Sequence, residues 1–211
     1  MPPGSLVCVI DDDESVCRSL TRLLRSAQVP AEPFSSAAAF LERETHDGPS
    51  CLVLDVRMPG INGLELQKTL AAREAQIVFL TGHADVPMCA EAMKAGAVDF
   101  LTKPVEDEDL LAAVGRALAR SAEIRQRLVE CAAARVRINT LTPREFEVMR
   151  RVIAGMLNKQ IAADLNSAVK TIKVHRGRVM EKMGVRSVAD LVRAAQAVRV
   201  MPVPPSLLST A

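Results

Sequence analysis

Apolar runs alternate with amphipathic stretches along the first 120 residues. The runs lie at 6–10, 51–54, 77–80 and 97–101, with a weaker one at 31–34. Helical patterns between them lie near residues 14–27, 35–44, 63–73, 86–95 and 106–120. Strands that alternate with helices of this length predict a parallel sheet covered on both faces. We therefore predict an α/β fold with a doubly wound, parallel, five-stranded sheet.

The pattern changes after residue 138, where only helices are predicted. Thr142, Pro143 and Glu145 combine an N-cap, a proline at the first helical position and a capping-box glutamate. Further helices are predicted at 159–165, at 169–183 ending at Gly184, and after Ser187. Short connections between these helices indicate a second, all-α four-helix domain.

Two segments remain outside these domains. Residues 121–138 are charged and helical in composition, without a sustained heptad pattern, so they extend the preceding helix or form an ordered linker. Residues 200–211 contain Met201-Pro-Val-Pro-Pro and are predicted to form a loose tail.

Length and charge support two domains of different character. A chain of 211 residues exceeds the commonest domain size. The net charge of +2 conceals 11 Lys and Arg against 18 Asp and Glu in residues 1–120, which gives −7. Residues 121–211 hold 16 against 7, which gives +9. A basic half indicates a polyanion partner, most simply nucleic acid, although chance surface charge is the alternative.

Cysteine usage and hydropathy indicate where the protein resides. The five cysteines are widely spaced and include no CxxC pair, which favours buried thiols in a reducing compartment. Neither a signal peptide nor a run of about 18 apolar residues is found, so we expect a cytoplasmic protein without membrane contact.

Polar residues follow the predicted strands at their carboxyl ends. Asp11 and Asp12 follow the first run, Asp55 follows the run at 51–54, and Thr81 and Lys103 follow the last two. In a doubly wound sheet these positions open onto one crevice. Clustered carboxylates need a cation, and hard oxygen ligands suit Mg²⁺. A carboxylate nucleophile, a cation, a hydroxyl and an ammonium are the parts needed to accept a phosphoryl group.

The motifs IDDDES, LDVRMPG, TGH and LTKP resemble bacterial response-regulator receiver domains over about residues 5–120. The resemblance implies a flavodoxin-like fold in which a sensor histidine kinase phosphorylates Asp55. It also implies that Mg²⁺ is held by Asp11, Asp12, Asp55 and the Arg57 backbone carbonyl. Lys103 would pair with the phosphoryl oxygens, and Thr81 would close on the phosphate. Phe100 would be the aromatic switch residue, and the Lys103-Pro104 bond would be cis.

Simpler interpretations exist for single residues of this region. Asp13 and Glu14 are expected to stabilise the first turn of a helix, and His83 is expected in a surface loop. Individually, Thr81 could cap a helix, Lys103 could be solvated and Phe100 could belong to the core. The combination of matching positions favours the phosphoryl site.

The helix at 169–183 has two distinct faces. Ile172, Val179 and Met183 form an inward stripe, and the opposite arc carries Lys170, Lys173, Val174, Gly177 and Arg178. A basic face with one apolar residue suits a helix that enters the major groove, because Lys and Arg bind guanine edges or phosphates and Val contacts a thymine methyl. A merely solvated helix is the alternative.

Residues 141–197 also resemble the LuxR-type helix-turn-helix, through LTPREFEVM, AGMLNKQIAADL, VKTIKVHRGRVMEKM and SVADLVRAA. The resemblance implies a scaffold helix at 158–165 and a recognition helix at 169–183. It implies that Lys173, Val174 and His175 lie near bases, and that Lys170, Thr171, Arg176 and Arg178 mainly contact phosphates. Gly177 departs from relatives that carry a long polar side chain there.

Together the two resemblances indicate a two-component response regulator of the FixJ/NarL type. The expected division is a receiver at 5–120, a helical linker at 121–138, a DNA-binding domain at 139–199 and a tail at 200–211. Phosphorylation would pair two copies through residues 86–119. The expected partners are a sensor histidine kinase and double-stranded promoter DNA, with RNA polymerase as a further candidate.

Two other functions compete with this interpretation. One is a Mg²⁺-dependent aspartyl-phosphate phosphatase or phosphotransferase, but the DxD signature of that class is missing because Val56 and Arg57 follow Asp55. The other is a DNA-binding regulator that works without phosphorylation. We expect no enzyme activity beyond self-phosphorylation and self-dephosphorylation at Asp55.

Overall fold

The computed structural model describes residues 1–73, 75–82 and 85–203. His83 and residues 204–211 of the expected tail lie outside these ranges. The chain divides into two compact units, Met1–Arg125 and Gln126–Ala211.

The first unit contains a five-stranded parallel sheet with the strand order β2-β1-β3-β4-β5. Its strands are β1 (Leu6–Ile10), β2 (Ala31–Phe34), β3 (Ser50–Leu54), β4 (Gln76–Thr81) and β5 (Asp99–Thr102). Its helices are α1 (Glu14–Ser26), α2 (Ala37–Leu41), α3 (Gly63–Leu70), a 3-10 turn (Ala71–Arg73), α4 (Val86–Lys94) and the first part of α5 (Asp107–Ile138). The predicted α/β fold with a doubly wound parallel sheet is confirmed.

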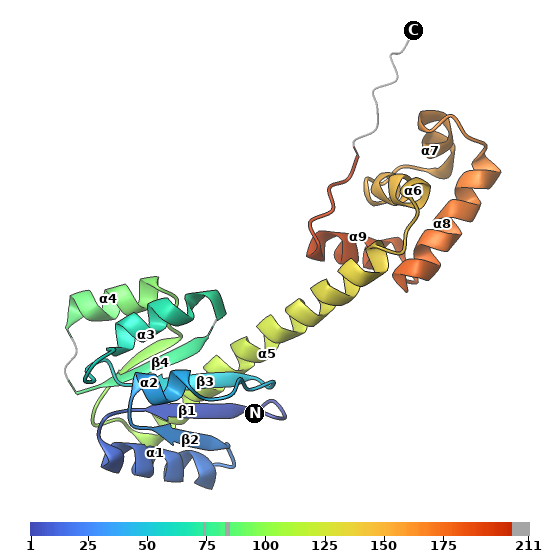
Figure 1. Ribbon diagram of the computed structural model, residues 1–211. Coiled ribbons are helices and arrows are strands. Elements are labelled where there is room, and N and C mark those ends of the chain that lie inside the picture. The colour runs from blue at the N-terminus through green and yellow to red at the C-terminus, as the bar shows by residue number, and fades with distance from the viewer. Residues whose placement is uncertain (74, 83–84, 204–211) are drawn as a thin grey trace. The chain divides into compact units, whose positions relative to one another are not determined.

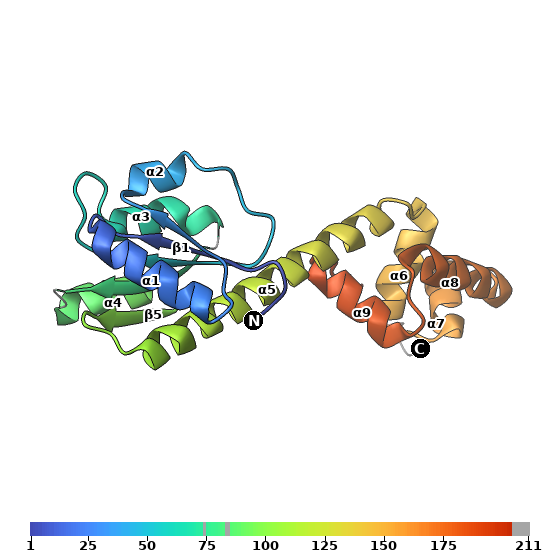
Figure 2. The same cartoon turned by 90° about the horizontal axis from the view of Figure 1, so that it is seen from below.

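Side chains of each strand pack alternately on the two faces of the sheet. Val7 and Val9 pack with α1 and α5, whereas Cys8 and Ile10 pack with α2, α3 and α4. Figure 1 shows α1 below the sheet and α3 and α4 above it, and Figure 2 shows α1 and the first part of α5 on the same face. Because both faces are buried, the strands appear in the sequence as nearly continuous apolar runs.

Polar side chains cap the starts of two helices in this unit. Asp13 is the N-cap of α1 and accepts a hydrogen bond from the Ser15 backbone N–H at 2.7 Å. Ser36 caps α2 by accepting from the Ala39 N–H at 3.1 Å. Asp13 is therefore a helix cap, as expected, and hydrogen bonds from the Ser15 side chain and backbone lower its pKa. Residues 121–138 continue α5, which agrees with the first of the two alternatives for that segment.

The second unit contains α6 (Pro143–Ile153), α7 (Asn158–Asp164), α8 (Val169–Met183) and α9 (Val188–Ala197). Its core includes the fully buried side chains of Met149, Ile161, Ile172, Val179 and Leu191. The predicted four helices are thus confirmed, including the capping box of α6 and the end of α8 at Gly184, whose φ is 63°.

Hydrogen bonds attach the flanking segments of this unit to its helices. Arg137, near the end of α5, donates from Nη1 to the carbonyl of Met183 at 3.3 Å. The Val203 N–H donates to the Arg150 carbonyl at 3.2 Å, and Arg150 Nε donates to the Met201 carbonyl at 2.9 Å. The described start of the predicted loose tail is therefore bonded to α6.

No helix in the described part of the chain combines the length and apolar content of a membrane span.

Candidate functional site

The carboxyl ends of β1 and β3 bring three aspartates together. The two strands are neighbours with Ile10 opposite Leu54, and the Asp55 N–H donates to the Ile10 carbonyl at 2.9 Å. The residues that follow the strands therefore lie side by side. One carboxylate oxygen from each of Asp11, Asp12 and Asp55 lies within 4.8 Å of the others. Asp11 and Asp55 are buried and Asp12 is exposed.

Lys103 enters this cluster from the end of β5. Its Nζ lies 2.5 Å from Asp11 Oδ2 and 3.5 Å from Asp55 Oδ1. The Lys103 N–H donates to the Thr81 carbonyl at 2.9 Å, which joins the ends of β4 and β5. The Lys103-Pro104 peptide bond is cis, as the family resemblance implied.

The surroundings of Asp55 and Lys103 raise the pKa values of both side chains. Burial raises the pKa of the Asp55 carboxyl, the neighbouring Lys103 ammonium opposes this shift, and the Asp11 carboxylate adds to it. Burial favours the neutral amine of Lys103, but the hydrogen bond to Asp11 and the charges of Asp55 and Asp11 together raise its pKa. The ammonium is therefore charged at neutral pH and offsets part of the negative charge in the site.

The donor set suits a small divalent cation. All three side chains offer carboxylate oxygens, the hard ligands that Mg²⁺ prefers. Asp55 Oδ1 is buried and has no hydrogen-bond partner among the described residues. The Lys103 ammonium forms an ion pair with this oxygen at 3.5 Å, and a bound cation would satisfy it further. The three predicted carboxylate ligands therefore fit Mg²⁺ chemically.

A surface hollow opens beside the cluster and provides access to it. Asp12 and Arg57 are both exposed and belong to its wall. Its other lining residues are Val56, Met58, Pro59, Asn62, Leu64 and Met88. The hollow therefore reaches the cluster at its exposed member, Asp12.

The two predicted switch residues lie on β4 and β5. Thr81 ends β4 and is buried, with 1% of its surface exposed. Phe100 is half-buried in β5 and packs against Phe79, with ring centroids 5.8 Å apart. Thr81 and Phe100 therefore lie on neighbouring strands, and Lys103 directly follows the second of them.

Gly63 supports the site in a way that sequence reasoning missed. In the sequence, the pair Asn62-Gly63 indicates only a turn. A Cβ atom at Gly63 would lie 2.3 Å from the carbonyl oxygen of Asp55 and 3.1 Å from Phe79 Cε1. The Gly63 N–H also donates to the Val56 carbonyl at 2.9 Å. The start of α3 can therefore pack directly against the backbone that carries Asp55 only because residue 63 has no side chain.

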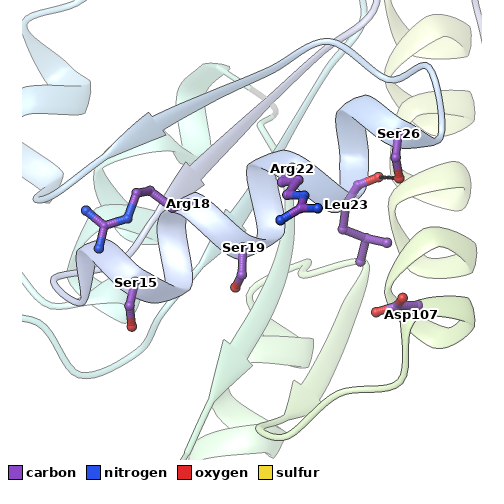
Figure 3. A pocket seen from close by; sticks show the side chains of 7 residues that line it. All are labelled: Ser15, Arg18, Ser19, Arg22, Leu23, Ser26 and Asp107. Carbon is purple, nitrogen blue, oxygen red and sulfur yellow. Dashed lines mark hydrogen bonds between the residues drawn. The ribbon is translucent and has the colours of Figure 1, made fainter.

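A second hollow is lined by residues of α1 and by Asp107 at the start of α5, and contains none of the predicted phosphoryl-site or metal-binding residues (Figure 3). Its lining residues are Ser15, Arg18, Ser19, Arg22, Leu23, Ser26 and Asp107. Arg18 pairs with Glu14 at 3.2 Å, and both side chains are largely exposed. Ser26 donates to the Leu23 carbonyl of its own helix at 2.7 Å. This hollow is a solvated helix surface.

The predicted DNA-contacting residues of α8 fall into two groups. Five are exposed: Lys170, Thr171, Lys173, Val174 and Arg178. Within the described residues, the three cations of this group form no ion pair or hydrogen bond. His175 and Arg176 are only half-exposed. Arg176 donates to Asn158 Oδ1 of α7 at 2.9 Å, and His175 Nδ1 is buried without a hydrogen-bond partner in the same described range.

Comparisons with known proteins agree with this geometry. Residues 7–115 match the family described as response regulator receiver domain, and residues 139–195 match the bacterial regulatory proteins of the luxR family.

Three relatives match both units of the chain. Nodulation protein W of Bradyrhizobium diazoefficiens is 46% identical over 91% of this chain and 86% of its own length. The transcriptional regulatory protein FixJ of Azorhizobium caulinodans is 46% identical over 96% of this chain and 97% of its own. The low-resolution structure of the response regulator StyR is 45% identical, with a TM-score of 0.79, and covers 92% of this chain and 98% of that one.

Proposed function

This chain belongs to the response regulators that join a receiver domain to a LuxR-family DNA-binding domain, and from that premise we propose that phosphorylation of Asp55 controls its DNA binding. Its homologues are transcriptional regulators, which separates it from conventional enzymes. We assign the receiver to residues 5–120, the helical linker to 121–138 and the DNA-binding domain to 139–199.

Asp55 is the proposed acceptor because it is a buried carboxylate whose Oδ1 accepts no hydrogen bond and lies 3.5 Å from the Lys103 ammonium. In the transfer, an Asp55 carboxylate oxygen forms a bond to phosphorus while the bond from phosphorus to a histidine nitrogen of the kinase breaks. Lys103, 3.5 Å from Asp55 Oδ1, stabilises the negative charge of the transferred group. Asp11, Asp12, Asp55 and the Arg57 carbonyl would hold Mg²⁺, which neutralises phosphoryl charge when it is bound.

The phosphorylated aspartate would then act on β4 and β5. The added oxygens attract the Thr81 hydroxyl and the Lys103 ammonium, because both can donate hydrogen bonds to them. Phe100 moves further inward as Thr81 is drawn toward the phosphoryl group. The surface formed by α4, β5 and the start of α5, at residues 86–119, changes shape and pairs with the same surface of a second copy.

DNA binding is assigned to the outer face of α8. Lys173, Val174 and His175 lie near bases in this proposal, and Lys170, Thr171, Arg176 and Arg178 mainly contact phosphates. Arg176 would keep Nη1 on Asn158 and use its remaining donors for the phosphate. A sensor histidine kinase, promoter DNA and RNA polymerase are the proposed partners, and the cytoplasm is the proposed location of this chain.

One experiment tests the link between the two units. The full chain is treated with acetyl phosphate and Mg²⁺, and phosphoryl uptake is measured by intact-protein mass spectrometry. Binding is then measured on duplexes selected from a random-sequence pool. Wild type should take up one phosphoryl group and bind DNA more tightly, and Asp55→Asn should do neither.

Asp13→Asn is the matched control, because asparagine also caps helices and Asp13 lies outside the proposed ligand set. It should take up phosphoryl as wild type does. Uptake by Asp55→Asn at the wild-type rate would show that another residue is the acceptor.

A further inference from the structure

Gly177 lies at the centre of the exposed face of α8. Lys170 and Lys173 are seven and four residues before it, Val174 is three before it, and Glu181 is four after it. These spacings place all five residues on the same side of the helix. All of them are exposed. The middle of the proposed DNA-reading surface therefore has no side chain.

The fold does not require a glycine at this position. A Cβ atom at Gly177 would meet no atom within 4 Å, and its φ is not positive. Gly63 and Gly184 differ, because a Cβ at Gly63 would clash with backbone and Gly184 has a φ of 63°. A glycine in a helix interior destabilises the helix by about 1 kcal/mol relative to alanine. Alanine would thus be the more stable choice for the protein alone.

The missing side chain leaves a notch with an apolar wall. Val174 is 48% exposed and adjoins Gly177 one helical turn earlier. Lys173 and Arg178 are on the flanks of this notch, where they can bind phosphates or guanine. The backbone of α8 can approach a ligand more closely at residue 177 than at any position that carries a Cβ.

We propose that Gly177 is a specificity-determining residue that, with Val174, receives the C5-methyl group of a thymine. The inference rests on the proposed function, because it requires α8 to be the DNA-reading helix. The thymine methyl is the apolar group that base pairs present in the major groove, so the exposed Val174 wall of the notch favours an A·T pair there. A side chain at residue 177 would fill the space that the methyl group occupies.

Deoxyuridine tests this directly, because it differs from thymidine only by lacking that methyl group. The phosphorylated full chain is used to select duplexes from a random-sequence pool, and each thymine of the preferred sequence is replaced by uracil in turn. Burial of one methyl group corresponds to about a fourfold change in affinity. We expect one thymine in each half-site whose replacement weakens wild-type binding by about that factor.

Gly177→Ala should bind the thymine duplex at least about fourfold more weakly than wild type and should no longer distinguish thymine from uracil. Its thermal unfolding temperature should rise, which shows that weaker binding does not come from misfolding. Gly115→Ala, in α5, is the matched control for helix propensity and should leave thymine discrimination unchanged, since a Cβ there meets only Met1 Cε at 3.7 Å.

Two results would overturn the proposal: discrimination of thymine from uracil by Gly177→Ala as strong as in wild type, or no uracil-sensitive thymine in any selected duplex. Lys173→Ala distinguishes a failure of the Gly177 proposal from a failure of the proposed function. If α8 reads DNA, that variant loses affinity for every duplex. If it binds as wild type does, the DNA-reading face itself is wrong.

Discussion

The acidic site at the sheet edge and the outer face of α8 use charge in opposite ways. In the first, the buried carboxylates of Asp11 and Asp55 lie within 3.5 Å of the Lys103 ammonium. In the second, Lys170, Lys173 and Arg178 are exposed and make no ion pair among the described residues. One region holds its opposite charges within the protein, and the other leaves its positive charges for a partner.

This difference suits the proposed role of each region. A reaction site must hold charged groups in fixed positions before the substrate arrives, and burial strengthens their interactions. A surface that binds a polyanion gains from cations that are still solvated, because they replace counterions on the phosphates. Pairing the α8 cations within the protein would weaken that gain.

The largest expected difference between the two regions is in how DNA affinity and phosphoryl uptake respond to salt. DNA affinity of the phosphorylated chain should fall about 10³-fold between 50 and 200 mM salt if the two copies together contact about six phosphates. Phosphoryl uptake from acetyl phosphate should change little, because buried charges are screened much less than exposed ones. Both are measured on one preparation across the same salt series. A flat binding curve would remove the phosphate contacts assigned to α8.

Removal of Lys103 tests the preformed character of the acidic site. Lys103→Ala should slow phosphoryl uptake about 100-fold, a typical consequence of deleting one positioned donor. Burial and the Asp11 charge would then act on Asp55 without opposition from the ammonium, so the Asp55 pKa should rise further. Lys68→Ala is the control, since Lys68 is an exposed lysine paired with Glu91 at 2.9 Å. Equal rates for both variants would contradict the assigned role of Lys103.

The clustering of the three aspartates with Lys103 could be predicted because the sheet imposes the positions of its strand ends. Asp55 and Lys103 each follow an apolar run, and parallel neighbouring strands bring their carboxyl ends to one edge. The contact between Gly63 and the Asp55 carbonyl could not be predicted, because it depends on how closely α3 packs against the loop after β3. An Asn-Gly pair at a helix start signals a turn in any packing.

The second unit was predictable in its helices but less so in its side-chain partners. Periodicity identified the buried stripe of α8, and the capping box identified the start of α6. The hydrogen bond from Arg176 to Asn158 depends on the packing of α7 against α8, which helical periodicity does not reveal. The start of the tail was predicted to be loose because its prolines exclude a helix, yet its carbonyl and N–H groups bond to Arg150.

Gly63→Ala should affect the packed region in the direction opposite to that expected for Gly177→Ala in the open one. The new Cβ would overlap the Asp55 carbonyl, and overpacking of this kind typically destabilises a fold by about 1–3 kcal/mol. Urea unfolding followed by circular dichroism measures the loss, and phosphoryl uptake should slow as the Asp55 backbone shifts. Gly115→Ala should show no loss. If Gly63→Ala is as stable as wild type, the close approach of α3 is not a constraint on the site.

Glu145 provides the smallest and sharpest test, because it is a buried charge inside the DNA-binding unit. Its side chain is 2% exposed, accepts a hydrogen bond from Lys182 Nζ at 2.6 Å and completes the α6 capping box. We expect that burial, and not the unit in which a charge lies, requires a charge to be paired within the protein. In that case the loss of the Glu145–Lys182 pair should destabilise the DNA-binding unit. Glu145→Gln should then lower stability by about 1–2 kcal/mol, a range reduced because Lys182 is partly exposed.

The Glu145–Lys182 pair also predicts the direction in which the stability of the protein changes with pH. The hydrogen bond from Lys182 and those from Thr142 lower the Glu145 pKa from its usual 4.5 to about 2. A carboxyl with a lowered folded-state pKa stabilises the fold above its unfolded pKa, and this contribution is lost as pH falls from about 4.5 toward 2. Wild type should lose stability over that window more steeply than Glu145→Gln, in urea unfolding at each pH. Asp190, whose pKa is also lowered by Ser187, leaves a residual slope in both proteins. Glu147→Gln is the control, because it removes only the exposed partner of Arg144, and its stability should depend on pH as that of wild type does. If the stability of Glu145→Gln also depends on pH as that of wild type does, the buried Glu145–Lys182 pair does not stabilise the fold.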